Sequence, residues 1–136
     1  MIEYKLLENK LKAEDFIRLK LSARFRERSV ELVEKALDNN LYDVVAVTGG
    51  EVIGMGRLVG DGVMYWYLQE IIVLPKYQKQ GIGTKIVNHL VDYAVSHSGT
   101  GKFTTIGGVS AKGKEEFYRK LGFEIISNGI KKMIEI

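Results

Sequence analysis

The stretch IIVLPKYQKQGIGTK, residues 71–85, decides the fold. Its first four residues are apolar, which is typical of a buried β-strand, and Pro75 ends that strand because proline has no backbone N–H to donate. A loop follows. Gly81 and Gly83 then open a segment whose apolar residues recur at helical spacing, which predicts a helix over about residues 81–96. The stretch therefore predicts a strand, a loop and a helix in direct succession.

The two glycines make this loop a candidate anion-binding site. Because neither glycine carries a side chain, the backbone N–H groups of residues 80–84 could close around an anion. The N-terminus of the helix adds about half a positive charge there. Three cationic side chains flank the loop: Lys76, Lys79 and Lys85. This chemistry suits a diphosphate, and a glycine-relaxed loop before an ordinary helix is the alternative interpretation.

Outward from this stretch, the periodicity of the apolar residues predicts strands and helices along the whole chain. Gly49-Gly50 has the form of a two-residue hairpin turn, and Ser29 can cap a helix. The predicted strands cover residues 2–6, 42–48, 51–59, 63–74, 103–106, 123–126 and 130–136, and the further helices cover about 13–23, 30–37 and 114–121. Adjacent antiparallel strands with helices inserted between them indicate a mixed sheet covered by helices.

The composition bounds the classes of protein to which the chain can belong. We expect one domain over 1–136, since 136 residues with 46% hydrophobic and 27% charged side chains are typical of a globular domain. The absence of cysteine excludes disulfides, cysteine zinc sites and thiol nucleophiles, and two histidines are too few for a histidine-rich metal cluster, so no metal is expected. The net charge of +3 is too small to indicate nucleic acid. No apolar run is long enough for a membrane, and we expect a cytoplasmic protein.

Two motifs resemble those of the GNAT superfamily of N-acetyltransferases. Gln78-x-x-Gly81-x-Gly83 resembles its acetyl-CoA signature Q/R-x-x-G-x-G/A, and residues 117–123, FYRKLGF, resemble its F-Y-x-K-x-G-F segment. The resemblance covers roughly residues 42–126, and the N-terminal helix pair fits the acceptor-side region more loosely. It implies an α/β (α+β) fold with a mixed, mostly antiparallel sheet of six to seven strands flanked by about four helices.

The resemblance also implies how acetyl-CoA would bind as co-substrate. The strand before the loop would splay from its parallel neighbour at residues 103–106, and its backbone at Ile71, Ile72 and Val73 would bind the pantetheine arm. The diphosphate would be held by Gln78, Lys79, Gln80, Gly81, Ile82, Gly83, Thr84 and Lys85. Phe117 and Tyr118 complete the expected cofactor-binding set, although Phe117 also suits the core. Many members have an asparagine seven residues before the tyrosine, where this chain has Ala111.

Two residues are expected to act in catalysis. Tyr118 matches the family tyrosine beside the CoA sulfur, where its hydroxyl would protonate the leaving thiolate, and a tyrosine that only packs is the alternative. Glu70 would accept the amine proton, since a partly buried glutamate beside aromatic residues can have a raised pKa. Strict alternation puts Glu70 on the face opposite Tyr67 and Gln69, which match the usual base positions, and a β-bulge would bring it back. A water relay, or capture of the neutral amine, is the alternative.

The expected activity is direct transfer of an acetyl group from acetyl-CoA to a primary amine in a ternary complex. The alternative is a non-catalytic module of the same fold that binds acyl-CoA. The acceptor would be a small-molecule or peptide amine, and a homodimer is an option because dimers are common in the superfamily. The charged segment 24–28 is either a solvated turn or a rim of the acceptor site, and Arg57 is a second candidate for holding an anionic group. Residues 108–114 nearly match a P-loop, but Glu115 replaces its Ser or Thr.

Overall fold

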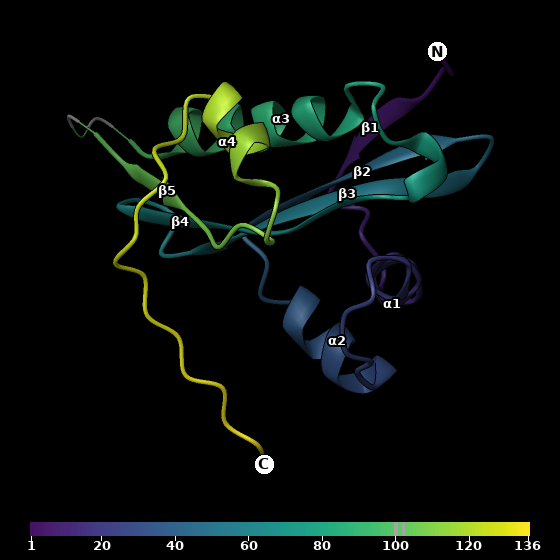
Figure 1. Cartoon of the computed structure of the whole chain (residues 1–136), viewed down its shortest axis with the longest axis horizontal. Helices are drawn as coiled ribbons and strands as arrows, with labels where there is room; N and C mark the ends of the chain where they lie inside the picture. The colour runs from purple at the N-terminus through teal and green to yellow at the C-terminus, as the bar shows by residue number, and fades with distance from the viewer. Residues whose placement is uncertain (100, 102) are drawn as a thin grey trace.

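The computed structural model describes residues 1–99, 101 and 103–136, and within these residues five strands form one sheet (Figure 1). Its order is β1-β2-β3-β4-β5, in which the first four strands pair antiparallel and β5 pairs parallel to β4. The strands are β1 (Lys5–Glu8), β2 (Tyr42–Thr48), β3 (Glu51–Gly60), β4 (Tyr65–Val73) and β5 (Thr105–Gly107). The mixed, mostly antiparallel sheet expected from the sequence is confirmed.

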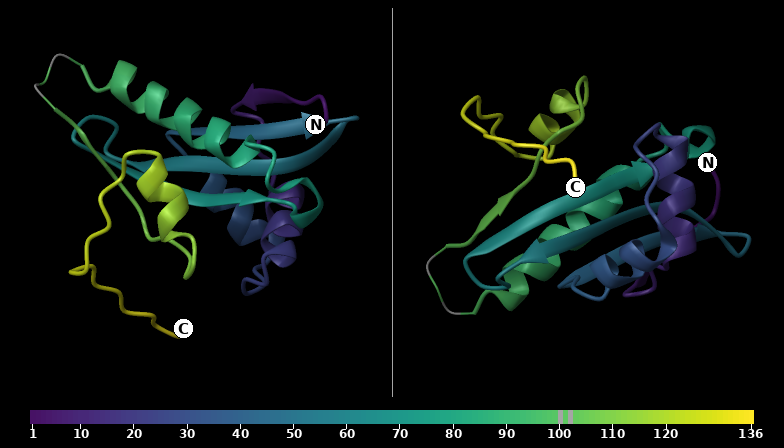
Figure 2. Two further views of the ribbon diagram at one scale, coloured as in Figure 1. Left: turned by 45° about the horizontal axis from the view of Figure 1, so that its top comes forward. Right: turned by 90° about the horizontal axis from the view of Figure 1, so that it is seen from below.

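Helices cover both faces of this sheet. α1 (Ala13–Ser22) and α2 (Val30–Leu37) lie on one face, and α3 (Ile82–His97) and α4 (Glu115–Lys120) lie on the other (Figures 1 and 2). A 3-10 turn, η1 (Pro75–Tyr77), follows β4. As predicted, Ser29 caps α2 by accepting a hydrogen bond from the N–H of Leu32 at 3.3 Å. The expected four helices are therefore present, one pair on each face.

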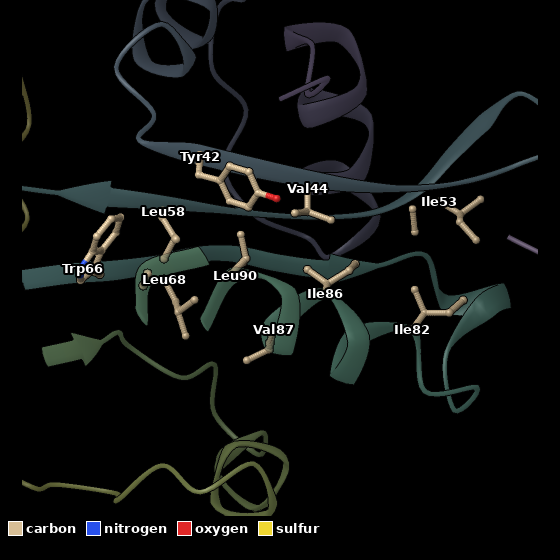
Figure 3. Packing of buried hydrophobic residues seen from close by; sticks show 12 residues of the cluster. Tyr42, Val44, Ile53, Leu58, Trp66, Leu68, Ile82, Ile86, Val87 and Leu90 are labelled. Carbon is tan, nitrogen blue, oxygen red and sulfur yellow. The ribbon is translucent and has the colours of Figure 1, made fainter. Parts of the chain in front are cut away.

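Two apolar clusters hold these layers together. On one face, α3 packs its buried side chains against β2, β3 and β4, as Figure 3 shows for Ile86, Leu90 and Leu58. On the other face, Phe16, Leu19 and Val33 of α1 and α2 pack against Val45, Met55 and Ile72. Burying an apolar side chain of this size contributes about 1.5–3 kcal/mol relative to leaving it exposed.

The contact between β3 and α3 depends on a glycine. A Cβ atom at Gly56 would lie 2.7 Å from Cδ1 of Ile71 and 2.8 Å from Cγ2 of Ile86. No real Cβ contact is that short, so a larger residue would force α3 away from the sheet. Gly56 thereby sets how closely α3, whose N-terminus opens the candidate site, lies on the strands.

The closing hairpin predicted over 123–126 and 130–136 is wrong. Residues 123–136 form no strand, and the sheet has five strands instead of six to seven. A two-stranded hairpin is marginal in water unless it docks on a larger sheet, and β5, the strand at that edge, is only three residues long. The apolar residues of this segment therefore stay exposed, among them Ile126, Ile130, Met133, Ile134 and Ile136.

Smaller differences concern the ends of strands. The first strand begins at Lys5, three residues later than predicted, while Ile2 and Tyr4 still pack against the α3-side cluster. β5 begins two residues later than predicted. Within the described residues, no helix is both long enough and apolar enough to cross a membrane.

Candidate active site

β4 and β5 separate after a short stretch of pairing. Residues 65–67 of β4 lie opposite residues 105–107 of β5, and β4 then continues to Val73 while the chain after Gly107 turns away (Figure 2). In the described part of the chain, no strand lies beside β4 at this edge from Leu68 onward. The expected splay of the two parallel strands is present, and its free backbone groups can pair with an extended ligand.

β4 contains the bulge that the sequence analysis required for Glu70. Arg57 lies opposite Gln69 and Met55 lies opposite Ile72, so Gly56 alone faces two residues, Glu70 and Ile71. Glu70 has a φ of +50°, a left-handed conformation that is uncommon outside glycine and costs about 1–3 kcal/mol. The bulge turns the Glu70 side chain to the α1 face, where it meets Arg57.

The Glu70 carboxylate is bound by cations. Its Oε2 accepts a hydrogen bond from Nε of Arg57 at 2.6 Å, and Nη1 of Arg57 donates to Oδ1 of Asn40 at 2.7 Å. The side chains of Arg57 and Glu70 are 13% and 12% exposed. Glu70 is partly buried as expected, but its polar partners are cations, not the aromatic residues that precede it in sequence. An amine proton can therefore reach it only in competition with an existing ion pair.

Lys20 of α1 is the second cation at this carboxylate. Its Nζ lies 4.0 Å from Oε1 of Glu70 and 4.0 Å from the centre of the Phe25 ring. Burial lowers the pKa of Lys20, the Glu70 carboxylate opposes that effect, and the positive charges of Arg28 and Arg57 lower the pKa further. Lys20 also lines a shallow depression between α1 and the following loop, with Phe16, Ile17, Leu21, Arg26, Glu27, Arg28 and Val33.

The start of α3 presents free backbone N–H groups. Gly81, the N-cap residue, has a φ of +82°, a conformation open to glycine at little cost. No described side chain caps the first turn, so its N–H groups face outward for an acceptor such as a phosphate. Lys79 and Lys85 are exposed beside this turn, whereas the side chain of Ile82 is buried in the core. Ile82 can thus contribute only its backbone to a ligand.

The two glutamines of the first motif brace the loop. Nε2 of Gln78 donates to the carbonyl of Val73 at 2.9 Å, which ties the loop to the end of β4. Oε1 of Gln80 accepts from the N–H of Ile2 at 3.2 Å, which ties it to the N-terminal segment. These contacts position the loop, and they leave its backbone N–H groups as the groups that can bind an anion.

α4 brings the second motif to the first. The ring of Phe117 would lie 3.5 Å from a Cβ atom at Gly83, so α4 packs on the first turn of α3. The ring of Tyr118 makes edge contacts with Phe117 and Phe123, at 5.0 and 5.8 Å between ring centres. Burial raises the pKa of Tyr118, which keeps its hydroxyl protonated at neutral pH and able to donate.

In the segment 108–114, which nearly matches a P-loop, a backbone N–H group is already bound by a carboxylate of the chain itself. The N–H of Gly113 donates to Oε1 of Glu115 at 2.7 Å. A phosphate there would have to displace that carboxylate, which repels it. The segment therefore serves as the connection between β5 and α4.

Lys20 and Asn40 are not among the site residues expected from the sequence. Lys20 follows Phe16 by four residues, so both lie on the buried face of α1, and a lysine on an apolar helix face is the signal that could have found it. Asn40 lies in the turn that ends α2, and no pattern in the sequence marks it. The three-dimensional pairing of both residues with the Glu70–Arg57 pair depends on the bulge.

Comparison with known families agrees with this geometry. The model of the acetyltransferase (GNAT) family matches residues 7–123. GCN5-related N-acetyltransferase 2, a chloroplast protein of Arabidopsis thaliana, is 33% identical over 86 residues, which are 61% of this chain and 31% of that protein. The match thus spans less than a third of that relative.

Solved structures that match nearly the whole chain include two bacterial proteins. A GNAT family acetyltransferase of Streptococcus pneumoniae is 30% identical, with a TM-score of 0.77 and 98% of each chain covered. A protein of methicillin-resistant Staphylococcus aureus, described as a probable acetyltransferase, is 26% identical, with a TM-score of 0.86 and coverage of 98% of this chain and 99% of that one.

Proposed function

Since the chain belongs to the GNAT acetyltransferase family, which uses acetyl-CoA, we propose that it is an N-acetyltransferase that moves the acetyl group to a primary amine by direct transfer within a ternary complex. The observation that carries the proposal is the position of the uncapped first turn of α3. It follows the free edge of β4 in the chain and is packed against α4, which bears Tyr118.

The cofactor-binding residues follow from this arrangement. The backbone of Ile71 to Val73 would pair with the amide groups of pantetheine, because that edge of β4 has no strand beside it. The N–H groups of the first turn of α3 would bind the diphosphate, with Lys79 and Lys85 adding positive charge from solvent. Gln78 would act by holding the loop, since its amide is bonded to Val73. Ala111 stands where many family members have an asparagine that contacts pantetheine, so that contact would be replaced or absent here.

The transfer needs one proton donor and one proton acceptor. A bond forms between the amine nitrogen and the acetyl carbon, the carbon–sulfur bond breaks, and the sulfur leaves as a thiolate. Tyr118 would donate its phenolic proton to that thiolate, and its burial keeps the proton in place until then. The amine must lose one proton to become the neutral amide product.

Glu70 is our candidate for accepting the amine proton. Its carboxylate lies on the α1 face, next to the β4 backbone proposed for pantetheine. Because Arg57 and Lys20 already bind the carboxylate, a proton would reach it most readily through a water molecule or after the ion pair loosens. Proximity of the two substrates, more than strong base catalysis, would supply much of the rate.

The test combines binding with turnover. Calorimetry with acetyl-CoA should give saturable binding, and release of free thiol should depend on the amine across a panel of small amines and short peptides with free N-termini. Mass spectrometry should find the product heavier by one acetyl group. Binding of acetyl-CoA without turnover of any amine would contradict the proposal and favour the non-catalytic acyl-CoA-binding module.

A further inference from the structure

A cluster of cations faces the acceptor side of the proposed site. Arg28 and Arg57 lie close enough to Lys20 for their charges to act on it, and Glu70 is the carboxylate in direct contact with Lys20 and Arg57. Glu27 and Arg26 lie on the rim of the same depression, and Arg26 is 3.8 Å from Glu135 of the C-terminal segment, with both of these side chains largely exposed. A second carboxylate, that of the buried Asp43, accepts a hydrogen bond from Asn40, which in turn accepts one from Arg57. Lys20 and Arg28 are thus the cations of the cluster that line the depression without a hydrogen-bonded carboxylate among the described contacts.

Two of the three cations, Lys20 and Arg57, lie where water is scarce, whereas Arg28 is exposed at the rim. The Lys20 side chain is 17% exposed and Arg57 is 13% exposed, and the ring of Phe16 lies 5.8 Å from the Arg57 guanidinium. The carboxylate nearest to Lys20 is 4.0 Å away, so the charge of this largely desolvated ammonium group is only partly compensated, which is unfavourable. An anion bound beside Lys20 would complete the compensation.

Lys20 also has hydrogen-bonding capacity to spare. Its 4.0 Å contact with Glu70 is longer than a hydrogen bond, and its other close contact is the Phe25 ring. An ammonium group has three N–H donors, so within the described chain it can serve a ligand without leaving Glu70. Arg57, in contrast, already uses Nε for Glu70 and Nη1 for Asn40.

The cluster is beside the place where the amine must react. Glu70 directly precedes Ile71, the first β4 residue proposed for pantetheine, and its side chain points to the face covered by α1 and α2. Phe117 and Tyr118 pack on the opposite face with α3 (Figure 1). An acceptor that approaches from the α1 face would therefore meet Lys20 and the arginines within a few atoms of its amine.

We infer that the amine acceptor carries an anionic group, a carboxylate or a phosphate, which Lys20 and Arg28 bind while Arg57 holds Glu70. The inference rests on the proposed function and narrows its substrate class. Polycationic acceptors such as polyamines and aminoglycosides would be repelled by Lys20 and Arg28.

The test uses matched amines that differ only in the distal group. Initial rates of thiol release would be compared for 4-aminobutyrate, butylamine and 1,4-diaminobutane, and for 2-aminoethyl phosphate and ethanolamine. We expect kcat/KM for each anionic amine to exceed that of its neutral partner at least tenfold, and the diamine to be the poorest substrate. The preference should shrink as salt rises, because salt screens exposed charges. Comparing the two anionic amines distinguishes carboxylate from phosphate.

Two variants tie the preference to the cluster. Lys20→Met keeps the length of the side chain and removes its charge, so the ratio of anionic to neutral kcat/KM should fall about tenfold, and Lys20→Arg should restore part of it. Lys12→Met, at an exposed lysine just before α1, should leave the ratio unchanged. Equal rates for anionic and neutral amines would overturn the inference and leave the transferase proposal intact.

A binding measurement distinguishes failure of the anion-site inference from failure of the transferase proposal. Calorimetry of 4-aminobutyrate and of 2-aminoethyl phosphate with the CoA-saturated protein should give binding that Lys20→Met weakens. If no amine is acetylated but this Lys20-dependent binding persists, the transferase proposal fails and the anion site stands. If neither probe binds, the anion site is wrong whatever the turnover.

Discussion

Glu70 is a residue of the candidate site with a left-handed backbone conformation although it is not glycine. Its φ is +50°, in the middle of a strand. This conformation is stabilised by the contacts of the Glu70 side chain on the α1 face, which are a 2.6 Å hydrogen bond from Arg57 and the nearby Lys20. The charge-assisted bond offsets part of the cost of the bulge. The bulge in β4 thus brings the Glu70 carboxylate to the cations on the proposed acceptor side.

Replacing the Glu70 carboxylate by an amide should affect both stability and rate. In Glu70→Gln, Arg57 and Lys20 lose their shared counter-charge, so we expect the free energy of unfolding to fall by about 1–3 kcal/mol. If Glu70 accepts the amine proton, the loss of kcat/KM should be largest at low pH, where most of the amine is protonated, and smaller at high pH. Urea unfolding and a pH–rate profile check both effects, and a rate loss of equal size at every pH would argue against a role as base.

Tyr118 should matter for turnover and not for cofactor affinity. In Tyr118→Phe the ring packing against Phe117 and Phe123 is kept and only the proton donor is lost, so kcat should fall roughly 10²-fold with little change in acetyl-CoA binding. Tyr93→Phe, which removes a hydroxyl from the distant half of α3, is the matched control. An unchanged single-turnover rate would remove Tyr118 from the mechanism.

The pH profile gives an independent check on Tyr118. Since burial raises the pKa of Tyr118 above its usual value near 10, the hydroxyl keeps its proton across the range in which amines lose theirs. The rate of the wild-type protein should therefore rise with pH up to about 9 without an alkaline decline. A decline below pH 9 that is absent from Tyr118→Phe would mean that the phenol ionises early, contrary to its burial.

At the scale of elements, the loop before α3 depends on the backbone conformation of Gly81. An alanine there has free space around its Cβ but must adopt a φ of +82°, which costs about 1 kcal/mol or rearranges the loop. We expect Gly81→Ala to weaken acetyl-CoA binding about tenfold or more, because the first-turn N–H groups of α3 would be displaced from the diphosphate.

Gly50 provides the matched control for this prediction. It has a similar φ of +77° and equally free space around a Cβ atom, but it lies in the hairpin turn between β2 and β3. Gly50→Ala should thus lower the melting temperature by a similar amount and leave acetyl-CoA binding unchanged. Calorimetric titration and thermal unfolding of both variants separate strain from a binding role, and equal affinities would show that the loop does not bind the diphosphate.

At the scale of the whole molecule, the C-terminal segment is the feature without a place in the sheet. Ile130 and Met133 are 99% and 65% exposed, and β5 leaves one edge of the sheet unpaired in the described part of the chain. Apolar side chains are rarely left exposed in a row. The homodimer that the sequence left open as an option is untested, and we predict that its contacts lie in residues 124–136.

A charge placed in this segment tests that prediction. We expect the wild-type chain to sediment as a dimer and the double variant Ile130→Asp, Ile134→Asp to sediment as a monomer, because each aspartate would have to be desolvated at the interface. Val95→Asp, at an exposed aliphatic residue of α3, is the control and should stay dimeric. A wild-type monomer at all concentrations, or a double variant that still dimerises, would contradict the prediction.

The sequence by itself determined the family and the elements on which the cofactor-binding side of the site is proposed. Two local patterns carry this prediction, the strand-loop-glycine-helix pattern of residues 71–85 and the segment 117–123. Local patterns can be recognised in a sequence because propensity, turn residues and apolar periodicity all act within a few positions. For that reason β4, α3 and α4 occur where they were predicted, within one or two residues. Length and composition likewise predict one domain over residues 1–136.

Only the tertiary structure decided the acceptor side and the last strands. Whether Glu70 faces Arg57 depends on a one-residue bulge in β4, and whether Lys20 joins them depends on how α1 docks on the sheet. The alternation in residues 123–136 suits a strand, but a strand also needs a partner with free backbone groups, and a sequence pattern does not supply one. Contacts between distant segments are set by the packing of whole elements, so these features could be proposed from the sequence but not decided by it.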